Sequence, residues 1–250
     1  MSNTKEGPNQ IILNSLKNCK LISDFENITF KSLKGGVSSN IWRVSQGGRT
    51  FCLKQALPKL KVKASWNAPL ERNKFEAEWC QIANKLVPGS APHIIYKDAN
   101  NLFFAMEYFD PTTYKLWKSE LVLKGGKQHD SGRVGKFLSM IHKQAAGNKK
   151  IYDRFPKNDI FHAIRLEPYF ETLITKYPDL KLTLKKLSKN TEHTRLTMIR
   201  GDISPKNILI GPQGPIFLDA ECACIGDPAF DLAFCLNHLL LKCLLAPEQK

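Results

Sequence analysis

The chain has 250 residues, and its 37 Lys and Arg against 23 Asp and Glu give a formal net charge of +14. This length predicts one domain or two closely coupled lobes, with a core that needs no disulfide or metal to support it. Hydrophobic residues make up 42% of the chain and charged residues 24%. That composition is typical of a globular protein and argues against disorder, collagen and a membrane protein.

The two ends of the chain carry neither a membrane-span pattern nor a secretion-signal pattern. The longest apolar stretch, near 232–246, is interrupted by Asn237, His238 and Lys242 and falls short of the roughly 20 apolar residues of a spanning helix. Residues 1–10 are polar, unlike a signal peptide. The seven cysteines form no CxxC pair, which favours reduced, mostly buried thiols. We therefore expect a cytoplasmic protein without a membrane partner.

The positive charge is distributed unevenly along the sequence. Residues 201–250 hold 3 basic and 6 acidic side chains, against 34 and 17 in residues 1–200. Binding of nucleic acid is one interpretation of such a basic chain, but lysines outnumber arginines 29 to 8, and base reading relies on arginine. We expect the lysines to form a solvated surface and no nucleic-acid partner. Acids within apolar sequence are the rarer feature, at Asp202, Asp219, Asp227 and Asp231.

In chain order, residues 1–109 predict a lobe with a five-stranded antiparallel sheet and one helix across it. A short helix is expected at 9–23, and apolar residues at helical spacing predict the crossing helix at 70–86. Turn signals such as Gly47–Gly48 separate the strands. The strands are expected at Ile28–Leu33, Ile41–Val44, Thr50–Gln55, His93–Lys97 and Leu102–Tyr108.

Residues 110–250 predict a second, mainly helical lobe. Helices are expected at 113–123, 132–146, 160–176 and 179–189, and from Phe230 to the end. A hairpin of two short strands, Asn207–Ile210 and Ile216–Leu218, is embedded late in this lobe. Strands followed by helices predict an α+β protein of two lobes.

The strongest chemical signal is the loop at 200–210. Asp202 precedes Asn207 by five residues, and Asp219 ends the next expected strand, so a hairpin would bring Asp219 back beside Asn207. In phosphoryl transfer, one carboxylate accepts the proton of the attacking hydroxyl, while an Asn and a second carboxylate hold Mg²⁺. Taken singly, an Asx-turn at Asp202 and a strand-end cap at Asp219 are the simpler interpretations.

The run 201–233 contains Leu-Asp-Ala-Glu at 218–221 and Gly-Asp-Pro-Ala-Phe-Asp at 226–231. It resembles the aminoglycoside phosphotransferase and choline kinase superfamily, which are small-molecule kinases with a protein-kinase-like fold. The resemblance covers about residues 28–245. It implies transfer of the γ-phosphate of ATP to a hydroxyl of a small metabolite, with Asp202 as the catalytic base and Asn207 and Asp219 as ligands of Mg²⁺.

The resemblance also assigns a phosphate-binding half to residues 1–109. Gly35, Gly36 and Ser38 look like the loop that covers the phosphates, where glycine lets backbone N–H groups approach closely. On its own this segment is equally a hairpin turn. Lys54 is similar to the strand lysine held over the α- and β-phosphates, although an edge-strand charge with its head in water is the plain alternative.

Two further positions complete the nucleotide site that the resemblance implies. The helix after Lys54 should supply its ion-pair partner, for which Glu76 is favoured and Glu78 stays open. The segment with Glu107 and Phe109 resembles the hinge between the lobes, whose backbone would bind the adenine edge. Glu221 would face either the acceptor or a second metal ion.

The sequence departs from the family pattern at two places. Arg200 stands where relatives usually have histidine, and only 19 residues follow Asp231, where relatives continue through acceptor-binding helices. The second lobe is therefore expected to be shortened, in a minimal member or in part of a longer protein. A catalytically impaired nucleotide-binding protein is the alternative function. Asp227 and Asp231 are expected to be structural, and His142 is expected to be a packed helix residue.

The sequence motifs do not single out one acceptor molecule. The link at 56–58, Trp66 and the helix start at 71–72 resemble methylthioribose kinases, whereas the catalytic loop is more similar to general aminoglycoside-phosphotransferase-like proteins. The strongly basic chain favours an anionic or neutral acceptor over a polycationic aminoglycoside.

Overall fold

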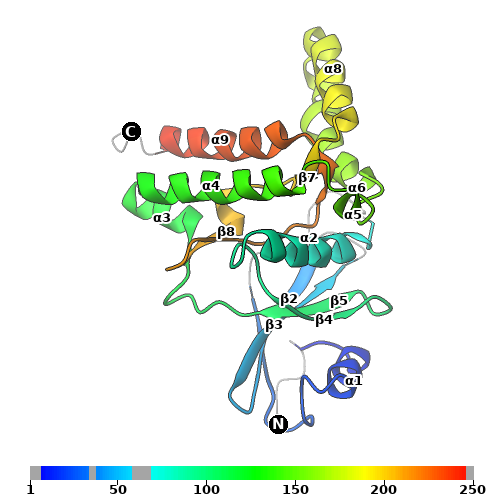
Figure 1. Cartoon of the computed structure of the whole chain (residues 1–250), viewed down its shortest axis with the longest axis vertical. Coiled ribbons are helices and arrows are strands. Elements are labelled where there is room, and N and C mark those ends of the chain that lie inside the picture. Colours follow the sequence, from blue (N-terminus) through cyan, green and yellow to red (C-terminus); the bar gives the residue numbers. More distant parts are fainter. Residues whose placement is uncertain (1–6, 34–37, 58–68, 246–250) are drawn as a thin grey trace.

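The computed structural model of the chain describes residues 7–33, 38–57 and 69–245. Figure 1 shows a five-stranded sheet with helix α1 (Gln10–Asn18) beside it, and a mainly helical part that includes α4 (Gln128–Ala145) and α9 (Pro228–Leu245). Helix α2 (Arg72–Leu86) lies between the sheet and the helices. The expected α+β class, with one helix across a five-stranded antiparallel sheet, is confirmed.

The large sheet has the strand order β1-β2-β3-β5-β4, and each neighbouring pair is antiparallel. β2 and β3 pair over their whole length and are joined by Gly47 and Gly48, both at positive φ. A two-residue hairpin turn with both φ values positive follows the right-handed twist of its strands. The strands are β1 (Thr29–Ser32), β2 (Ser39–Gln46), β3 (Arg49–Ala56), β4 (Ile94–Asp98) and β5 (Phe103–Glu107).

The helical part holds two small sheets that frame its loops. One has the order β6-β8-β9, and the other pairs β7 with β10. Residues 200–207 connect β7 to β8, and residues 218–223 connect β9 to β10. Both acidic loops therefore join the same two small sheets. The strands are β6 (Lys115–Leu116), β7 (Thr197–Ile199), β8 (Ile208–Ile210), β9 (Pro215–Phe217) and β10 (Cys224–Gly226).

The remaining helices are short, apart from α8. The segment before α8 contains a π-helix, η1, with Pro168 inside it. These elements are α3 (Trp117–Lys124), α5 (Lys149–Tyr152), α6 (Asp159–Phe161), η1 (His162–Glu171), α7 (Leu173–Lys176), η2 (Pro178–Leu180), α8 (Lys181–His193) and the 3₁₀ turn η3 (Pro205–Asn207).

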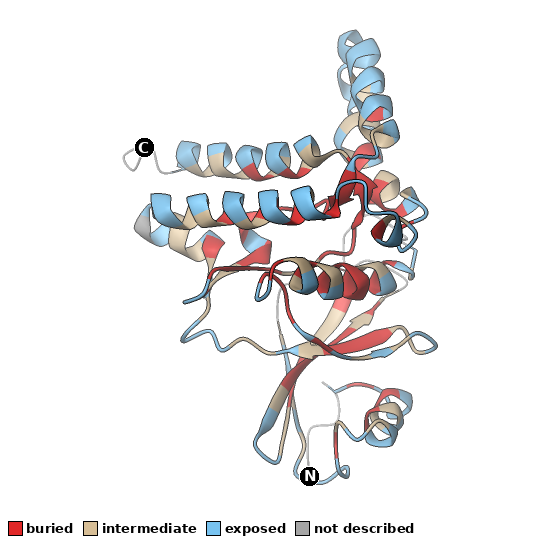
Figure 2. Cartoon of the chain, viewed as in Figure 1, coloured by how far each residue is buried: buried red, intermediate tan, exposed pale blue. Residues whose placement is uncertain are grey.

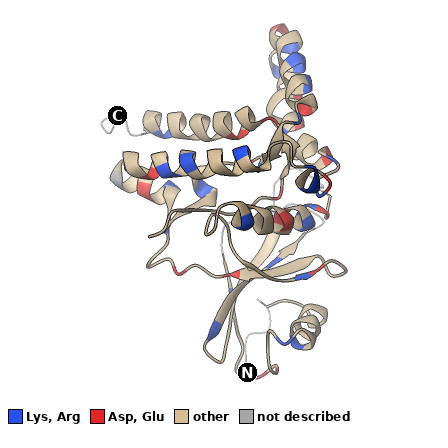
Figure 3. Cartoon of the chain, in the orientation of Figure 1, with Lys and Arg blue, Asp and Glu red and all other residues tan. Residues whose placement is uncertain are grey.

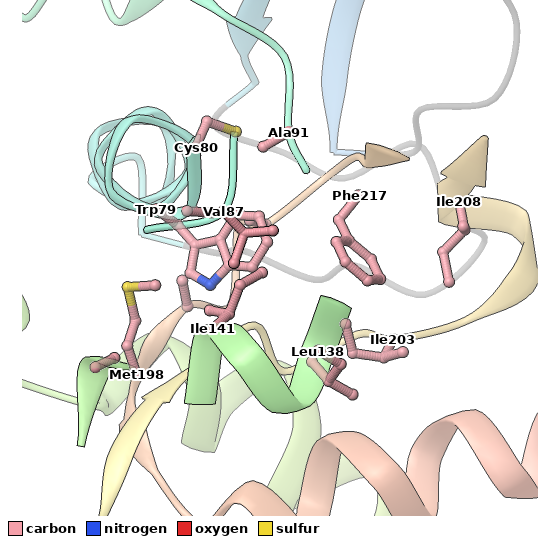
Figure 4. Close-up of a cluster of buried hydrophobic side chains, with 14 of the residues drawn as sticks. Trp79, Cys80, Val87, Ala91, Leu138, Ile141, Met198, Ile203, Ile208 and Phe217 are labelled. Carbon is pink, nitrogen blue, oxygen red and sulfur yellow. The ribbon is translucent and has the colours of Figure 1, made fainter. Parts of the chain in front are cut away.

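The largest core joins α2 to the helical part. Figure 4 shows Trp79 of α2 beside Ile141 of α4, with Phe217 of β9 next to them. The Trp79 and Phe217 rings meet edge to face, with their centroids 6.2 Å apart. A second core lies under α1, which buries Ile12 and Leu16 against the sheet. Because α2 contacts both the sheet and α4, it fixes the two parts relative to each other.

Two helices expose much of their surface. Figure 2 shows α8 almost wholly exposed and α9 exposed along its outer side. α9 is long and apolar enough, by length and composition alone, to cross a membrane, and little of it is buried; core helices and signal sequences pass the same test. Figure 3 shows Lys and Arg distributed over α2, α4, α8 and the sheet.

The structure corrects several expected boundaries. The first helix ends at Asn18, not at residue 23, and Lys20 just after it has a φ of 60°. The helix expected at 113–123 begins only at Trp117, after β6. The single helix expected at 160–176 is three segments, because Pro168 cannot donate an α-helical hydrogen bond. β7 and β10 were not expected, since three-residue strands carry no periodic pattern.

Candidate active site

Lys54 lies at the centre of the site. β3 places it in the sheet, where antiparallel pairing sets it between Ile41 of β2 and Phe104 of β5. Its side chain is 2% exposed, and its ammonium lies 2.7 Å from the carboxylate of Glu76 and 2.5 Å from Oδ1 of Asp219. A buried charge needs such partners to offset the loss of hydration. Lys54 is thus no edge-strand lysine with its head in water.

Of the two candidate glutamates on α2, Glu76 makes the ion pair with Lys54. Glu78 points elsewhere: it accepts from Lys97 at 2.8 Å and pairs with Arg154. Residues two positions apart on a helix face different directions, so only one of the two can reach β3.

The three carboxylates around Lys54 respond differently to it. Burial would lower the pKa of Lys54, but the charges of Asp219, Glu76 and Glu221 raise it. Burial raises the pKa of Glu76 to about 7 against the opposing pull of Lys54, and the charge of Asp219 adds to the rise. For Asp219 burial also acts upward, but the charge and hydrogen bond of Lys54 outweigh it and lower the pKa to about 2. Asp219 is therefore the carboxylate held ionised.

Asp219 reaches Lys54 from a loop with unusual backbone geometry. Its φ is +63°, in the left-handed region that non-glycine residues rarely occupy. The loop is tied to the 200–207 segment by a hydrogen bond from the Leu218 N–H to the Asn207 carbonyl, 2.9 Å long. Asn207 is the last residue of η3 and does not open a strand, and Asp219 lies two residues beyond β9. Both corrections leave the two side chains neighbours.

The Asp202 loop is held in place by hydrogen bonds to Asp231 of α9. The buried carboxylate of Asp231 accepts the backbone N–H groups of Arg200 at 2.9 Å and Gly201 at 2.8 Å, and it lies 3.0 Å from Nε2 of His142. These contacts give Asp231 and His142 the structural positions expected for them. Gly201 has a φ of +75°, and a Cβ there would come within 2.9 Å of Cys222, so only glycine fits.

Asp202 itself is buried and surrounded by cations. Oδ2 accepts from Nη2 of Arg165 at 2.7 Å, and Lys206 lies 3.7 Å away. Arg200, fully buried in place of the usual histidine, donates from Nη1 to the Asp202 carbonyl. Its Nε and Nη2 find no hydrogen-bond partner in the part of the chain that the structure describes.

A cleft of about 470 Å³ opens between the sheet and the helical part. It brings together six of the residues expected in the site: Lys54, Glu76, Glu107, Phe109, Asn207 and Asp219. Asp202 does not line the cleft, but Lys206 does and lies next to Asp202, so the Asp202 loop adjoins it. The apolar walls were not expected from the sequence; they consist of Leu33, Ile41, Cys52, Met106, Leu116, Leu209 and Leu218.

Of the three residues expected in the phosphate-covering loop, the structure describes Ser38. Gly35 and Gly36 lie outside the described residues. Ser38 is buried, and its carbonyl accepts from Nη2 of Arg72 at 2.7 Å. Arg72 in turn lies 3.3 Å from Glu221, whose pKa is raised by burial and by the charge of Asp219. Ser38 and Glu221 thus meet at the start of α2.

The donors at Asn207 and Asp219 suit a hard divalent cation. Mg²⁺ is usually bound by one or two carboxylates together with substrate phosphates. Asp219 supplies an ionised carboxylate and Asn207 a buried side-chain amide, whose oxygen is a possible ligand, and both residues line the cleft. No cluster of three or more His, Cys, Asp or Glu side chains placed to hold a metal occurs in residues 7–33, 38–57 and 69–245. The residues therefore fit a Mg²⁺ that arrives with a nucleotide.

A model of the phosphotransferase enzyme family matches residues 29–241, which is most of the chain. The chain belongs to this family. Methylthioribose kinase of Yersinia enterocolitica is 24% identical over 226 residues, which span 80% of this chain and 56% of that enzyme. The corresponding enzyme of Bacillus cereus (strain G9842) is 23% identical, and the match spans 90% of this chain and 63% of the relative. The chain therefore spans less than two thirds of the length of these curated relatives.

Solved structures share the fold at low identity. A choline/ethanolamine kinase family protein from Mesorhizobium loti has a TM-score of 0.60 at 15% identity, with 92% of this chain and 70% of that chain covered. The streptomycin–ATP–APH(2″)-IIa ternary complex has a TM-score of 0.55 at 14% identity, with 90% and 74% covered. The kinase-like, two-lobed fold expected from the sequence is therefore confirmed.

Sequence reasoning missed Arg165, which reaches Asp202 from η1. Its only signal was a lone arginine within an apolar stretch, in a segment expected to be an ordinary helix. It also missed Arg72. This side chain contacts the carbonyls of Ser38, Leu57 and Pro69 and the carboxylate of Glu221, which lie far apart in the sequence.

Proposed function

We propose that this phosphotransferase moves the γ-phosphate of ATP to a hydroxyl group of a small molecule. The observation that carries the proposal is the meeting of Lys54, Glu76 and Asp219 in a cleft that Asn207 also lines. Lys54 would neutralise the α- and β-phosphates, and Glu76 would hold it in place. The apolar walls of the cleft would receive the adenine ring, with the backbone at Glu107 and Phe109 along its edge. The ATP complex of a protein with this fold supports the choice of nucleotide.

Asp202 would act as the general base in this reaction. Asn207 and Asp219 would hold Mg²⁺, which would supply neutralisation of charge on the transferring phosphoryl group. Asp202 would orient the acceptor hydroxyl and take its proton, a contribution of about 10² to 10⁴ in rate for general-base catalysis. Its carboxylate lies 2.7 Å from Arg165 and 3.7 Å from Lys206, and Lys206 lines the cleft, which supports a place for Asp202 beside the transferred group.

The acceptor we propose is a neutral sugar hydroxyl, such as that of methylthioribose. The guanidinium of Arg165 lies over the Phe234 ring, 5.5 Å from its centroid, so the chain's own cation already takes the position where an aromatic face would attract a cationic acceptor. Lys206 adds a second positive charge beside Asp202. Both argue against a polycationic aminoglycoside and against choline. A cytoplasmic location goes with this proposal, because ATP and free cysteines belong to that compartment.

The test is ADP release from Mg-ATP with methylthioribose, choline, ethanolamine and streptomycin supplied separately. We expect release with methylthioribose above the rate without acceptor. In Asp202→Ala, turnover should fall by about 10² to 10⁴, while nucleotide affinity stays within a few-fold. Asp153→Ala, an exposed aspartate of α5's C-cap, is the control and should turn over normally. Normal turnover in Asp202→Ala would contradict the assignment of the base.

A second candidate is a nucleotide-binding protein without transfer activity. Arg200 favours it, because this fully buried arginine stands where the catalytic loop of relatives usually has histidine, and two of its donor atoms have no partner within the described part of the chain. This candidate predicts nucleotide binding by the wild type without ADP release on any of the four acceptors or on water.

A further inference from the structure

Arg165 is a buried arginine in contact with Asp202, and the proposed reaction gives it no role in the transfer step itself. It is 7% exposed and comes from η1, whereas the other residues of the site lie on the sheet, on α2 and in the two acidic loops. All three donor groups of its guanidinium are occupied. Nη2 bonds Oδ2 of Asp202 at 2.7 Å, Nε bonds the Gly201 carbonyl at 2.6 Å, and Nη1 bonds the Ile164 carbonyl at 2.9 Å. The guanidinium is therefore fixed in one orientation.

The local sequence explains how η1 presents this arginine. In an α-helix the N–H of residue 168 would bond the carbonyl of residue 164, but Pro168 has no N–H. The Ile164 carbonyl accepts a bond from Nη1 of Arg165. At the end of the segment, the Thr172 N–H bonds the Glu167 carbonyl, five residues back, at 2.8 Å. Such wide turns are rare and occur mostly at functional sites.

The two oxygens of Asp202 have different surroundings. Oδ2 is held by Arg165, with Lys206 further away at 3.7 Å. Oδ1 is buried and has no hydrogen-bond partner among the described residues. A buried acceptor without a donor is costly, and a donor brought by a substrate would remove that cost. Asp202 thus has one oxygen bound by the protein and one buried oxygen without a hydrogen-bond partner among the described residues, in a loop that adjoins the cleft.

We propose that Arg165 is a positioning residue for phosphoryl transfer, which holds Oδ2 of Asp202 so that Oδ1 receives the acceptor hydroxyl. The inference rests on the proposed function. In the step, the acceptor O–H bond breaks and its proton passes to Oδ1. The acceptor oxygen forms a bond to the γ-phosphorus while the bond from that phosphorus to the β–γ bridging oxygen breaks, and ADP leaves. Arg165 touches neither phosphate nor acceptor.

The experiment compares Arg165→Met, Arg165→Lys and the wild type, with methylthioribose and with water as acceptors of the phosphoryl group from Mg-ATP. Arg165→Met removes all three hydrogen bonds, so Asp202 is free to rotate. Since small misplacements of a reacting group can cost about 10²-fold in rate, we expect kcat to fall by about that factor. KM for ATP should stay within a few-fold. Arg165→Lys keeps the charge and one bond, and should recover part of the loss.

Two controls separate positioning from folding. Arg49→Met, at an exposed arginine at the start of β3, should leave kcat and KM unchanged. In Arg165→Ala, added ethylguanidinium should restore part of kcat, whereas the same concentration of ethylammonium should restore less, because only the planar fork spans all three acceptors.

The outcomes are distinguishable. If the wild type releases ADP and Arg165→Met has the same kcat, the positioning role is overturned and the proposed function stands. Loss of ATP binding in both Arg165→Met and Arg165→Lys would also overturn it, in favour of a purely structural arginine. A wild type without ADP release on either acceptor would overturn the proposed function and this inference together.

Discussion

At the scale of single residues, Lys54 is one cation shared among three buried or partly buried acids. Glu76 is as deeply buried as Lys54, while the side chain of Asp219 is 30% exposed toward the cleft. The cation therefore stabilises the more accessible acid most, and its partner on α2 keeps a pKa raised to about 7. Burial makes Glu76 the acid that is costly to ionise.

This difference predicts how stability depends on pH. The pKa of Glu76 is higher in the folded protein, about 7, than its usual value of 4.5. Its contribution to stability is therefore complete below pH 4.5 and is lost as the pH rises through 7. Glu76→Gln should remove that decline, an effect of up to about 3 kcal/mol. Urea unfolding at pH 5, 6, 7 and 8, without nucleotide or Mg²⁺, measures it, with Glu71→Gln as the exposed control at the N-cap of the same helix. Parallel curves for wild type and Glu76→Gln would show that the acid is already ionised across this range.

The sequence predicted several of these residues and missed others for identifiable reasons. Lys54 was visible because a lone cation in an apolar strand is unusual. The choice between Glu76 and Glu78 needed the rotation of α2 about its axis, which periodicity gives only to within a residue or two. Arg165 could not be predicted, since its contact with Asp202 joins residues 37 positions apart through a π-helix.

At the scale of elements, α2 carries both chemistry and structure. One face holds Glu76 against Lys54, and another places Trp79 in the core beside Phe217 and Ile141 (Figure 4). Phe217 ends β9, two residues before Asp219. A single helix thus links the position of the lysine's partner to that of the Asp219 loop through ordinary packing.

Truncation of Trp79 should therefore affect both stability and the site. Trp79 is fully buried, and replacing a buried aromatic by alanine costs about 3–5 kcal/mol. We expect Trp79→Ala to lower the free energy of unfolding by that amount in urea titrations. Leu182→Ala, at an 83% exposed position on α8, should change it by less than about 0.5 kcal/mol. A small effect at Trp79 would mean that the core beneath α2 relaxes into the space.

The elements themselves were predictable where their patterns were long. The five strands and α2 follow alternating and helical periodicity, and their ends differ from expectation by a few residues at most. The short strands β7 and β10 were missed because three residues give no period, and their pairing joins segments that the sequence keeps apart. The interruption of 160–176 could have been suspected from Pro168, which is a rare residue inside a helix.

At the scale of the whole molecule, the cleft lies between the sheet and the helical part, and a ligand there contacts both. Mg-ATP should therefore stabilise the entire fold, by about 2.7 kcal/mol at a concentration 100 times its Kd. Thermal unfolding with and without Mg-ATP measures the shift, and EDTA should reduce it. The two-lobed architecture was predictable because the strand with Lys54 and the run 201–233, one in each half of the chain, both resemble motifs of the same kinase family.

Lys54→Met should reduce that stabilisation by about half or more. Without the ammonium, the phosphates lose a charged partner worth about 1.5–3 kcal/mol, and the unliganded protein also loses stability because the acids around position 54 remain buried. The matched control is Lys97→Met, which removes an ion pair of similar length with Glu78 outside the cleft. An equal Mg-ATP shift in Lys54→Met and wild type would contradict a phosphate-binding role for the lysine.

The left-handed backbone of Asp219 has a consequence for how this chain can change over time. A carboxylate is kept at a position where glycine would relieve strain of about 1 kcal/mol, so a substitution that stabilises this loop would remove the proposed metal ligand. Comparing Asp219→Gly with Asp219→Ala isolates the strain, since both lack the carboxylate and only glycine accepts a φ of +63° without cost. If glycine is the more stable of the two, selection for activity has maintained a weak point in the fold.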